Sequence, residues 1–357
     1  MPTARRTAAA LLAAVPLGVA LVTGCTATGG DGDPAPAPPS WTRAGTIDLD
    51  TTVNADVRPH DLAADPTGGV VALVGSSDRS WLVHLGDDGS TVRREIPAAG
   101  PDAEVAVTPD GTAVVAGIRD GVLTVLTVPP GDAEPTPTTV ATAATRSTLA
   151  LSPDGGTLVA ALPAEAGPAE LVAVDVATGQ VAARTAADVS PTHLVTGADG
   201  LTALAVRDGQ PVLARFTADL RPAGDPVVLP GAPAAPAGLA LTADGRAVAS
   251  VAGPTSGRLV VVDGAEVTTE VELSGTEDSG LDLAVDADGR YAYVPLAAYQ
   301  VEPGIVTVDL ATGERIGRTV LCPGAGSLGA IAASGDTLVA TGVCLGSGLT
   351  TTAFLLR

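Results

Sequence analysis

The 357-residue sequence contains no lysine, a single asparagine at Asn54 and few aromatic residues, which make up 2% of the chain. All 19 basic residues are therefore arginines. A chain without lysine forms neither a Schiff base with a carbonyl substrate nor the lysine contact of a phosphate-binding P-loop. The two tryptophans are too few for the aromatic docking surfaces that quinone cofactors need, and we expect no cofactor.

Positive charge is also scarce, because 40 acidic residues oppose the 19 arginines and give a formal net charge of −21. Such a charge disfavours binding to nucleic acid and electrostatic adhesion to anionic lipid. We therefore expect no nucleic-acid partner. The abundance of Ala, Gly and Pro without lysine is typical of a GC-rich genome, such as that of an actinobacterium.

Residues 1–24 have the layout of a secretory signal peptide. An arginine pair is followed by an apolar stretch at 8–21, and V-T-G-C at 22–25 ends it with small residues before a cysteine. The apolar stretch is too short for a good membrane-spanning helix. The pattern resembles the bacterial lipoprotein signal, which implies a lipid (palmitate) anchor at Cys25 on the extracytoplasmic face of the cell membrane. The alternative is an ordinary signal peptide with an incidental cysteine.

Residues 25–40 are rich in proline and glycine and contain no apolar periodicity. Such a segment cannot bury enough surface to order itself, so it predicts a semi-extended tether. The globular part is then residues 41–357. It divides into seven units of about 45 residues each, which leaves no room for a second domain.

One short pattern recurs seven times in the globular part: an aliphatic strand, a tight turn usually ending in Asp-Gly, and a second strand rich in Val, Leu and Ala. The turn glycines follow one another at intervals of 43 to 46 residues, at Gly68, Gly111, Gly155, Gly200, Gly245, Gly289 and Gly335. Repeats of about 40 to 50 residues without a helical or leucine-rich pattern are typical of four-stranded propeller blades. The sequence predicts an all-β, seven-bladed β-propeller.

The two ends of the propeller are each incomplete. The last repeat stops after its third strand at 349–356, whereas G-T-I-D-L-D at 45–50 precedes the first blade without a partner. We therefore expect the N-terminal strand to become the fourth strand of the last blade, which removes an exposed sheet edge.

Two cysteines remain once Cys25 is assigned to the lipid. The repeat register puts Cys322 just before the first strand of the last blade and Cys344 just after its second strand. Antiparallel neighbours bring these ends together, so we expect a disulfide in an oxidising compartment. The alternative, a redox or metal site, has no third ligand type nearby in sequence.

Several segments resemble a known group of propellers. S-P-D-G-G-T-L-V at 152–159, V-D-V-A-T-G-Q-V at 174–181, V-D-L-A-T-G-E-R at 308–315 and R-P-H-D-L-A at 58–63 are similar to YVTN-type seven-bladed propellers, which are related in shape to WD-repeat proteins and quinoprotein dehydrogenases. The resemblance covers residues 45–357 and implies the fold. The matching motifs are residues that form turns and strands, so they specify the fold and do not imply an activity.

Candidate binding residues lie at the mouth of the propeller, where loops of all blades converge. The position seven residues before each turn glycine holds Asp61, Glu104, Thr148, His193, Gly238, Asp282 and Leu328, and His60 adjoins the first of these. Ring order gathers Asp282, Asp61 and Glu104 on one side, with His193 opposite. Clustered carboxylates favour a cationic ligand or a metal and raise one another's pKa. The alternative is that these residues cap backbone groups and face water.

All three tyrosines fall in the sixth repeat, and Tyr299 lies in its long loop at 295–304. Tyrosine is enriched at interfaces, so Tyr299 is a candidate partner contact, whereas we expect Tyr291 and Tyr293 to pack in a strand.

Together these features predict a monomeric, membrane-anchored extracytoplasmic module for binding or assembly, without catalysis of its own. Its partner is an unidentified extracytoplasmic protein or a small cationic ligand. The alternative is a ligand-binding or lactonase-like hydrolytic propeller that uses the acidic mouth.

Overall fold

The computed structural model describes residues 39–164, 168–231, 234–253, 256–273, 279–280, 282–297, 302–345 and 350–357. The signal peptide, most of the tether, Cys25 and Tyr299 lie outside these residues, so predictions about them stay predictions. None of the helices in the described ranges is long and apolar enough to cross a membrane.

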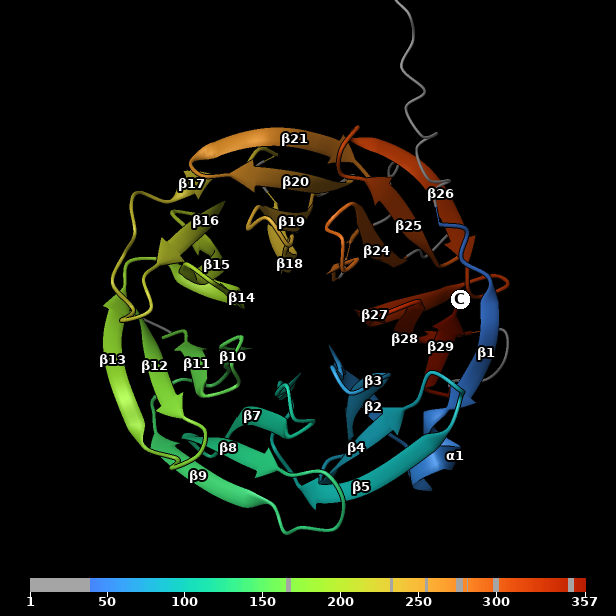
Figure 1. Cartoon of the computed structure of the whole chain (residues 1–357), viewed down its shortest axis with the longest axis horizontal. Helices are drawn as coiled ribbons and strands as arrows, with labels where there is room; N and C mark the ends of the chain where they lie inside the picture. The colour runs from blue at the N-terminus through green and yellow to red at the C-terminus, as the bar shows by residue number, and fades with distance from the viewer. Residues whose placement is uncertain are drawn as a thin grey trace, which may run out of the picture. The chain divides into compact units, whose positions relative to one another are not determined.

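The described residues form seven antiparallel sheets that stand as blades around a ring (Figure 1). Blade 1 comprises β2 (Arg58–Ala64), β3 (Val70–Gly75), β4 (Arg79–Leu85) and β5 (Thr91–Pro97). Blade 2 comprises β6 (Glu104–Val107), β7 (Ala113–Arg119), β8 (Val122–Val128) and β9 (Thr136–Ala141). Blade 3 comprises β10 (Thr148–Leu151), β11 (Thr157–Leu162), β12 (Ala169–Asp175) and β13 (Val181–Ala187). The predicted all-β, seven-bladed propeller is confirmed.

The second half of the ring repeats this order. Blade 4 comprises β14 (Ser190–Gly197), β15 (Gly200–Arg207), β16 (Gln210–Phe216) and β17 (Val227–Val228). Blade 5 comprises β18 (Ala235–Leu241), β19 (Ala247–Ala252), β20 (Gly257–Asp263) and β21 (Glu266–Glu272). In blade 6 the inner strand is split into β22 (Ser279–Gly280) and β23 (Ala284–Val285), followed by β24 (Tyr291–Ala297), β25 (Gly304–Asp309) and β26 (Glu314–Val320). In blades 1–6 the strand that comes first in the sequence is nearest the centre of the ring.

Blade 7 is closed by the N-terminal strand, as predicted. It comprises β27 (Gly326–Ser334), β28 (Thr337–Cys344), β29 (Thr352–Leu356) and β1 (Arg43–Asp48), and β1 pairs antiparallel with β29. Reciprocal backbone hydrogen bonds of 2.9 and 3.0 Å between Thr42 and Arg357 extend the pairing. The ring is therefore joined by strands from both ends of the domain.

A short helix, α1 (Leu49–Val53), leads from the closing strand into blade 1. Its N-cap Asp48 accepts a hydrogen bond from the Thr51 N–H at 2.9 Å, and its C-cap Asn54 has φ of 59°. Asparagine tolerates this left-handed conformation better than most residues, which explains where the only asparagine of the chain stands. Asp50 accepts backbone hydrogen bonds from Val57 and Thr351, so the turn is fixed to both neighbouring blades.

The hydrophobic core lies between the blades. Seven clusters of buried Val, Leu, Ala and Ile occupy the seven blade junctions, each built from residues of two neighbouring blades. At the junction of blades 6 and 7, Tyr291 and Tyr293 are buried, and Tyr293 meets the Trp41 ring edge-on at a centroid distance of 5.3 Å. The expectation that these two tyrosines pack in a strand is confirmed.

The predicted disulfide is also present at this junction. Cys322 and Cys344 are both buried and bonded to each other, with their Cα atoms 5.4 Å apart. The bond joins the segment before β27 to the end of β28, which pair as antiparallel neighbours.

Candidate functional site

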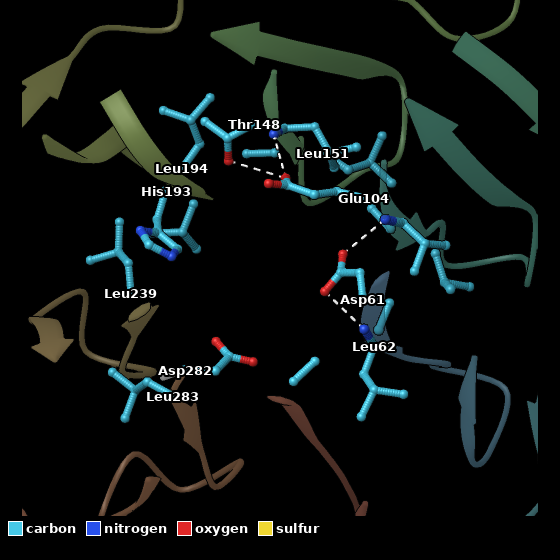
Figure 2. Close-up of a pocket in the computed structure, with 18 of the residues that line it drawn as sticks. Asp61, Leu62, Glu104, Thr148, Leu151, His193, Leu194, Leu239, Asp282 and Leu283 are labelled. Carbon is cyan, nitrogen blue, oxygen red and sulfur yellow. Dashed lines mark hydrogen bonds between the residues drawn. The ribbon is translucent and has the colours of Figure 1, made fainter. Parts of the chain in front are cut away.

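The inner strands surround a central channel with a volume of about 780 Å³, to which all seven blades contribute. Five of the predicted site residues line it: His60, Asp61, Glu104, His193 and Asp282. Figure 2 shows the side chains of Asp61, Glu104, His193 and Asp282 pointing into this common space from different blades. The sixth predicted residue, Tyr299, lies outside the described part of the chain.

β-Bulges at the start of the inner strands position several of these side chains. The register of β2 with β3 shifts between Pro59 and Asp61, and the register of β14 with β15 shifts between Pro191 and His193. A bulge adds one residue to a strand and redirects the side chains beside it. Proline suits such a position because it has no N–H to donate to the ladder. At these two positions a proline two residues earlier accompanies Asp61 and His193, which line the channel.

The three carboxyl groups connect neighbouring blades. Asp61 in blade 1 accepts a hydrogen bond of 2.9 Å from the Val105 N–H in blade 2, and another of 2.8 Å from the Leu62 N–H. Glu104 in blade 2 accepts through Oε2 from the Leu149 N–H of blade 3 at 2.7 Å. These bonds are dashed in Figure 2. Each carboxyl thus caps a backbone N–H group, as the alternative interpretation of the sequence expected, and the donor belongs to the next blade, which the sequence did not reveal.

Asp282 makes the same kind of contact at the junction of blades 6 and 7. Its Oδ2 accepts a hydrogen bond of 2.8 Å from the Ile331 N–H. Thr148, which the sequence did not single out, lines the channel and donates its hydroxyl to Glu104 at 3.1 Å. Thr148 and Leu149 both donate to Oε2 of Glu104, and among the described residues its Oε1 has no hydrogen-bond partner.

Burial changes the acidity of these groups. It raises the pKa of Asp61 and that of Asp282 to about 7, because a charge on a half-buried carboxyl is poorly solvated. Burial also raises the pKa of Glu104 well above its usual range, and the negative charge of Asp61 raises it further. The channel therefore holds carboxyl groups that exchange protons close to neutral pH.

His193 is held in one neutral form. Burial lowers its pKa to about 4, so the imidazole is uncharged at neutral pH. Its Nδ1 lies 3.1 Å from the Thr192 hydroxyl, which donates its own proton to the Leu204 carbonyl at 3.0 Å. With the Thr192 proton directed to the Leu204 carbonyl, Nδ1 is the donor in the contact with Thr192. This leaves Nε2 of His193 as a hydrogen-bond acceptor.

His60 and Gly238 show how tightly the start of the inner strands is packed. Burial lowers the pKa of His60, and a Cβ added at Gly75 would lie 2.3 Å from its Nε2. A Cβ added at Gly238 would lie 2.7 Å from the backbone carbon of Asp282. Glycine therefore occupies the site position in blade 5 because the backbone of blade 6 fills the space of a side chain. Within the described residues, no group of three or more His, Cys, Asp and Glu side chains is arranged to hold a metal ion.

Comparison with known proteins identifies the fold only. No family model and no curated protein matches the sequence. Among solved structures, the chain is similar to hydrazine synthase of Kuenenia stuttgartiensis, with a TM-score of 0.63 and 14% sequence identity over 82% of this chain and 94% of that chain. At this identity the similarity supports a propeller-like fold and carries no activity. The specific resemblance to YVTN-type or WD-repeat propellers stays a prediction.

The raised carboxyl pKa values predict an unusual dependence of stability on pH. Folding raises the pKa of Asp61 and Asp282 from 3.8 to about 7, so the folded state binds more protons than the unfolded state in this range. In the unfolded state His60 and His193 are at most half protonated from pH 6.5 upwards, and in the folded state their pKa values are lowered, so they oppose the effect only in part and less as the pH rises. The free energy of unfolding is therefore expected to decrease as the pH rises from 6.5 to about 8.

Urea unfolding at several pH values in this range measures the effect. Asp282→Asn should flatten the curve, whereas Asp208→Asn, on an exposed turn, should not. A stability that is constant or rises over this range in the parent protein would contradict the assignment.

Proposed function

We propose that this chain is an extracytoplasmic lipoprotein, anchored through Cys25, whose propeller is a non-catalytic binding module. The proposed ligand is a small cation or a basic segment of a protein partner that enters the central channel. The observation that carries the proposal is the convergence of three carboxyl groups, from blades 1, 2 and 6, on one channel of about 780 Å³.

The hydrogen bonds of the site favour binding over chemistry. Asp61 and Asp282 are fixed by backbone N–H donors of the next blade, so a ligand meets a preformed acidic surface. A cation that enters would stabilise the ionised form of these groups and would release their protons, because an opposite charge nearby lowers a carboxyl pKa. The net charge of −21 further attracts a cationic partner over long range.

The anchoring half of the proposal rests on the sequence. The signal-like segment ends at Cys25, and the proline- and glycine-rich residues 25–40 provide a tether to the propeller. An extracytoplasmic location fits the disulfide between Cys322 and Cys344, since such bonds persist in oxidising compartments.

Titration with spermidine, a linear polyamine, tests the binding site by calorimetry. We expect saturable binding at neutral pH that weakens about tenfold in Glu104→Gln, because hydrogen bonds to charged groups contribute more than neutral ones. The glutamine keeps a carbonyl oxygen for the Leu149 N–H, so the fold is preserved. Glu266→Gln, on the exposed outer strand β21, removes the same charge elsewhere and should leave the affinity unchanged. Equal affinities for all three proteins would exclude the channel as the site.

One observation favours the hydrolytic alternative. The neutral His193, with Nε2 as an acceptor, and carboxyl groups with a pKa of about 7 are the components of general acid and base catalysis. Hydrolysis of a lactone probe by the wild-type protein that is lost in His193→Gln would support this function in place of the binding module. The binding module predicts no turnover in either protein.

A further inference from the structure

A second cavity, with a volume of about 560 Å³, lies between blades 4 and 5. It is formed where β14 turns into β15 and where β18 turns into β19, and Arg215 on β16 is one of the residues that line it. None of the carboxyl groups discussed above lines this cavity. It is therefore a separate feature of the molecule.

Among the residues that the structure describes, no carboxylate forms an ion pair with Arg215. Its Nη2 atom is buried without a hydrogen-bond partner, and the guanidinium forms no ion pair in the described ranges. Asp244, which also lines the cavity, is bonded to the Thr242 hydroxyl and paired with Arg246 at 2.9 Å. A guanidinium that is partly removed from water without a partner is costly, and an anion in the cavity would offset the cost.

Alignment of the blades shows why this ion pair is missing. In blade 4 the pairing of the second and third strands begins with Leu201 and Phe216, and in blade 1 it begins with Val70 and Leu85. Arg215 precedes Phe216 as His84 precedes Leu85, so the two basic residues occupy the same position in their blades. His84 has an acidic partner, because its Nε2 lies 3.1 Å from Oδ2 of the buried Asp65.

Asp65 stands three residues before the turn glycine of blade 1. The same position in blade 4 is Gly197, which has no side chain. Blade 4 thus has a basic side chain, Arg215, at the position of His84, but it lacks the carboxylate that Asp65 provides in blade 1.

We propose that the cavity around Arg215 binds the carboxylate group of a small ligand, which takes the place of the missing acidic side chain. The planar guanidinium matches a carboxylate with two parallel hydrogen bonds. A monoanion is favoured over a phosphate dianion, because Asp199 and Asp244 also line the cavity and repel additional negative charge.

The test uses the full chain labelled with ¹⁵N-arginine and titrated with acetate, followed by the NMR signal of the Arg215 Nε–Hε group. Arg215→Gln identifies this signal by its loss. We expect a saturable shift of the Arg215 signal with acetate. Inorganic phosphate should bind at least about tenfold more weakly, because Asp199 and Asp244 repel the second negative charge of its dianion. Arg221→Gln, an exposed arginine of the same blade, is the control for net charge and should bind acetate like the parent.

Gly197→Asp provides a second, independent variant. It supplies the carboxylate that blade 1 has, and the added Cβ approaches only the flexible end of Leu241, at 2.8 Å. The Arg215 signal should then shift without acetate and should no longer respond to it. An Arg215 signal that does not move with acetate in the parent, or that saturates equally in Gly197→Asp, would overturn the proposal.

Discussion

A chain that lacks residues 41–48 is expected to aggregate, or to unfold at a markedly lower temperature than the parent. The deletion removes β1, which pairs with β29 from Arg43 to Asp48, and the Trp41 ring that packs on Tyr293. Blade 7 would be left with three strands and an open edge, which is a template for pairing between molecules. The N-cap Asp48 of α1 is lost with this segment, but Leu49 and Asp50 are retained, so the buried Leu49 side chain and the hydrogen bonds from Val57 and Thr351 to Asp50 are kept.

Thermal unfolding and size-exclusion chromatography measure the effect. Deletion of eight residues in the predicted tether, residues 28–35, is the control of equal length and should leave the melting temperature unchanged. A chain without 41–48 that stays monomeric and melts like the parent would show that the ring does not need this strand.

Replacement of Cys25 by serine is expected to move nearly the whole population of the protein from the membrane to the medium. Serine has no thiol for lipid attachment, and a chain with a net charge of −21 is repelled by anionic lipid. Thr26→Ala, at the neighbouring position, should leave the protein in the membrane fraction. Fractionation of cells followed by carbonate washing decides the matter. A Cys25→Ser protein that persists in the washed membranes would contradict lipid anchoring.

The propeller was predictable because its signals are local and repeated. Each blade carries its own turn glycine, such as Gly68 or Gly111, and these have φ of 124° and 83°, which favours glycine. Seven repetitions at nearly constant spacing made the architecture clear even though no single turn did. Closure by the N-terminal strand followed from counting strands, and the Cys322–Cys344 pair followed from the register of one blade.

The site was predictable only in part. The position of Asp61, Glu104 and Asp282 at the start of the inner strands followed from the repeat, and capping of backbone groups was one alternative, but the donors to these carboxyl groups could not be predicted. The Asp61 side chain bonds to Val105, which is 44 residues away, and no pattern within one blade specifies the register between blades. The tautomer of His193 depends on the acceptor of the Thr192 hydroxyl proton. This acceptor is the Leu204 carbonyl on the neighbouring strand, which the sequence alone does not identify.

The most direct test of the proposed binding site is the number of protons released when a cation binds. Calorimetric titration with spermidine at pH 7, in two buffers with different ionisation enthalpies, measures this number. Because Asp61 and Asp282 have a pKa of about 7, they are partly protonated in the free channel, and a bound cation would ionise them. We predict binding with net release of protons, and a smaller release in Asp282→Asn. Binding with the same enthalpy in both buffers, or no saturable heat, would contradict a cation site formed by the carboxyl groups of the channel.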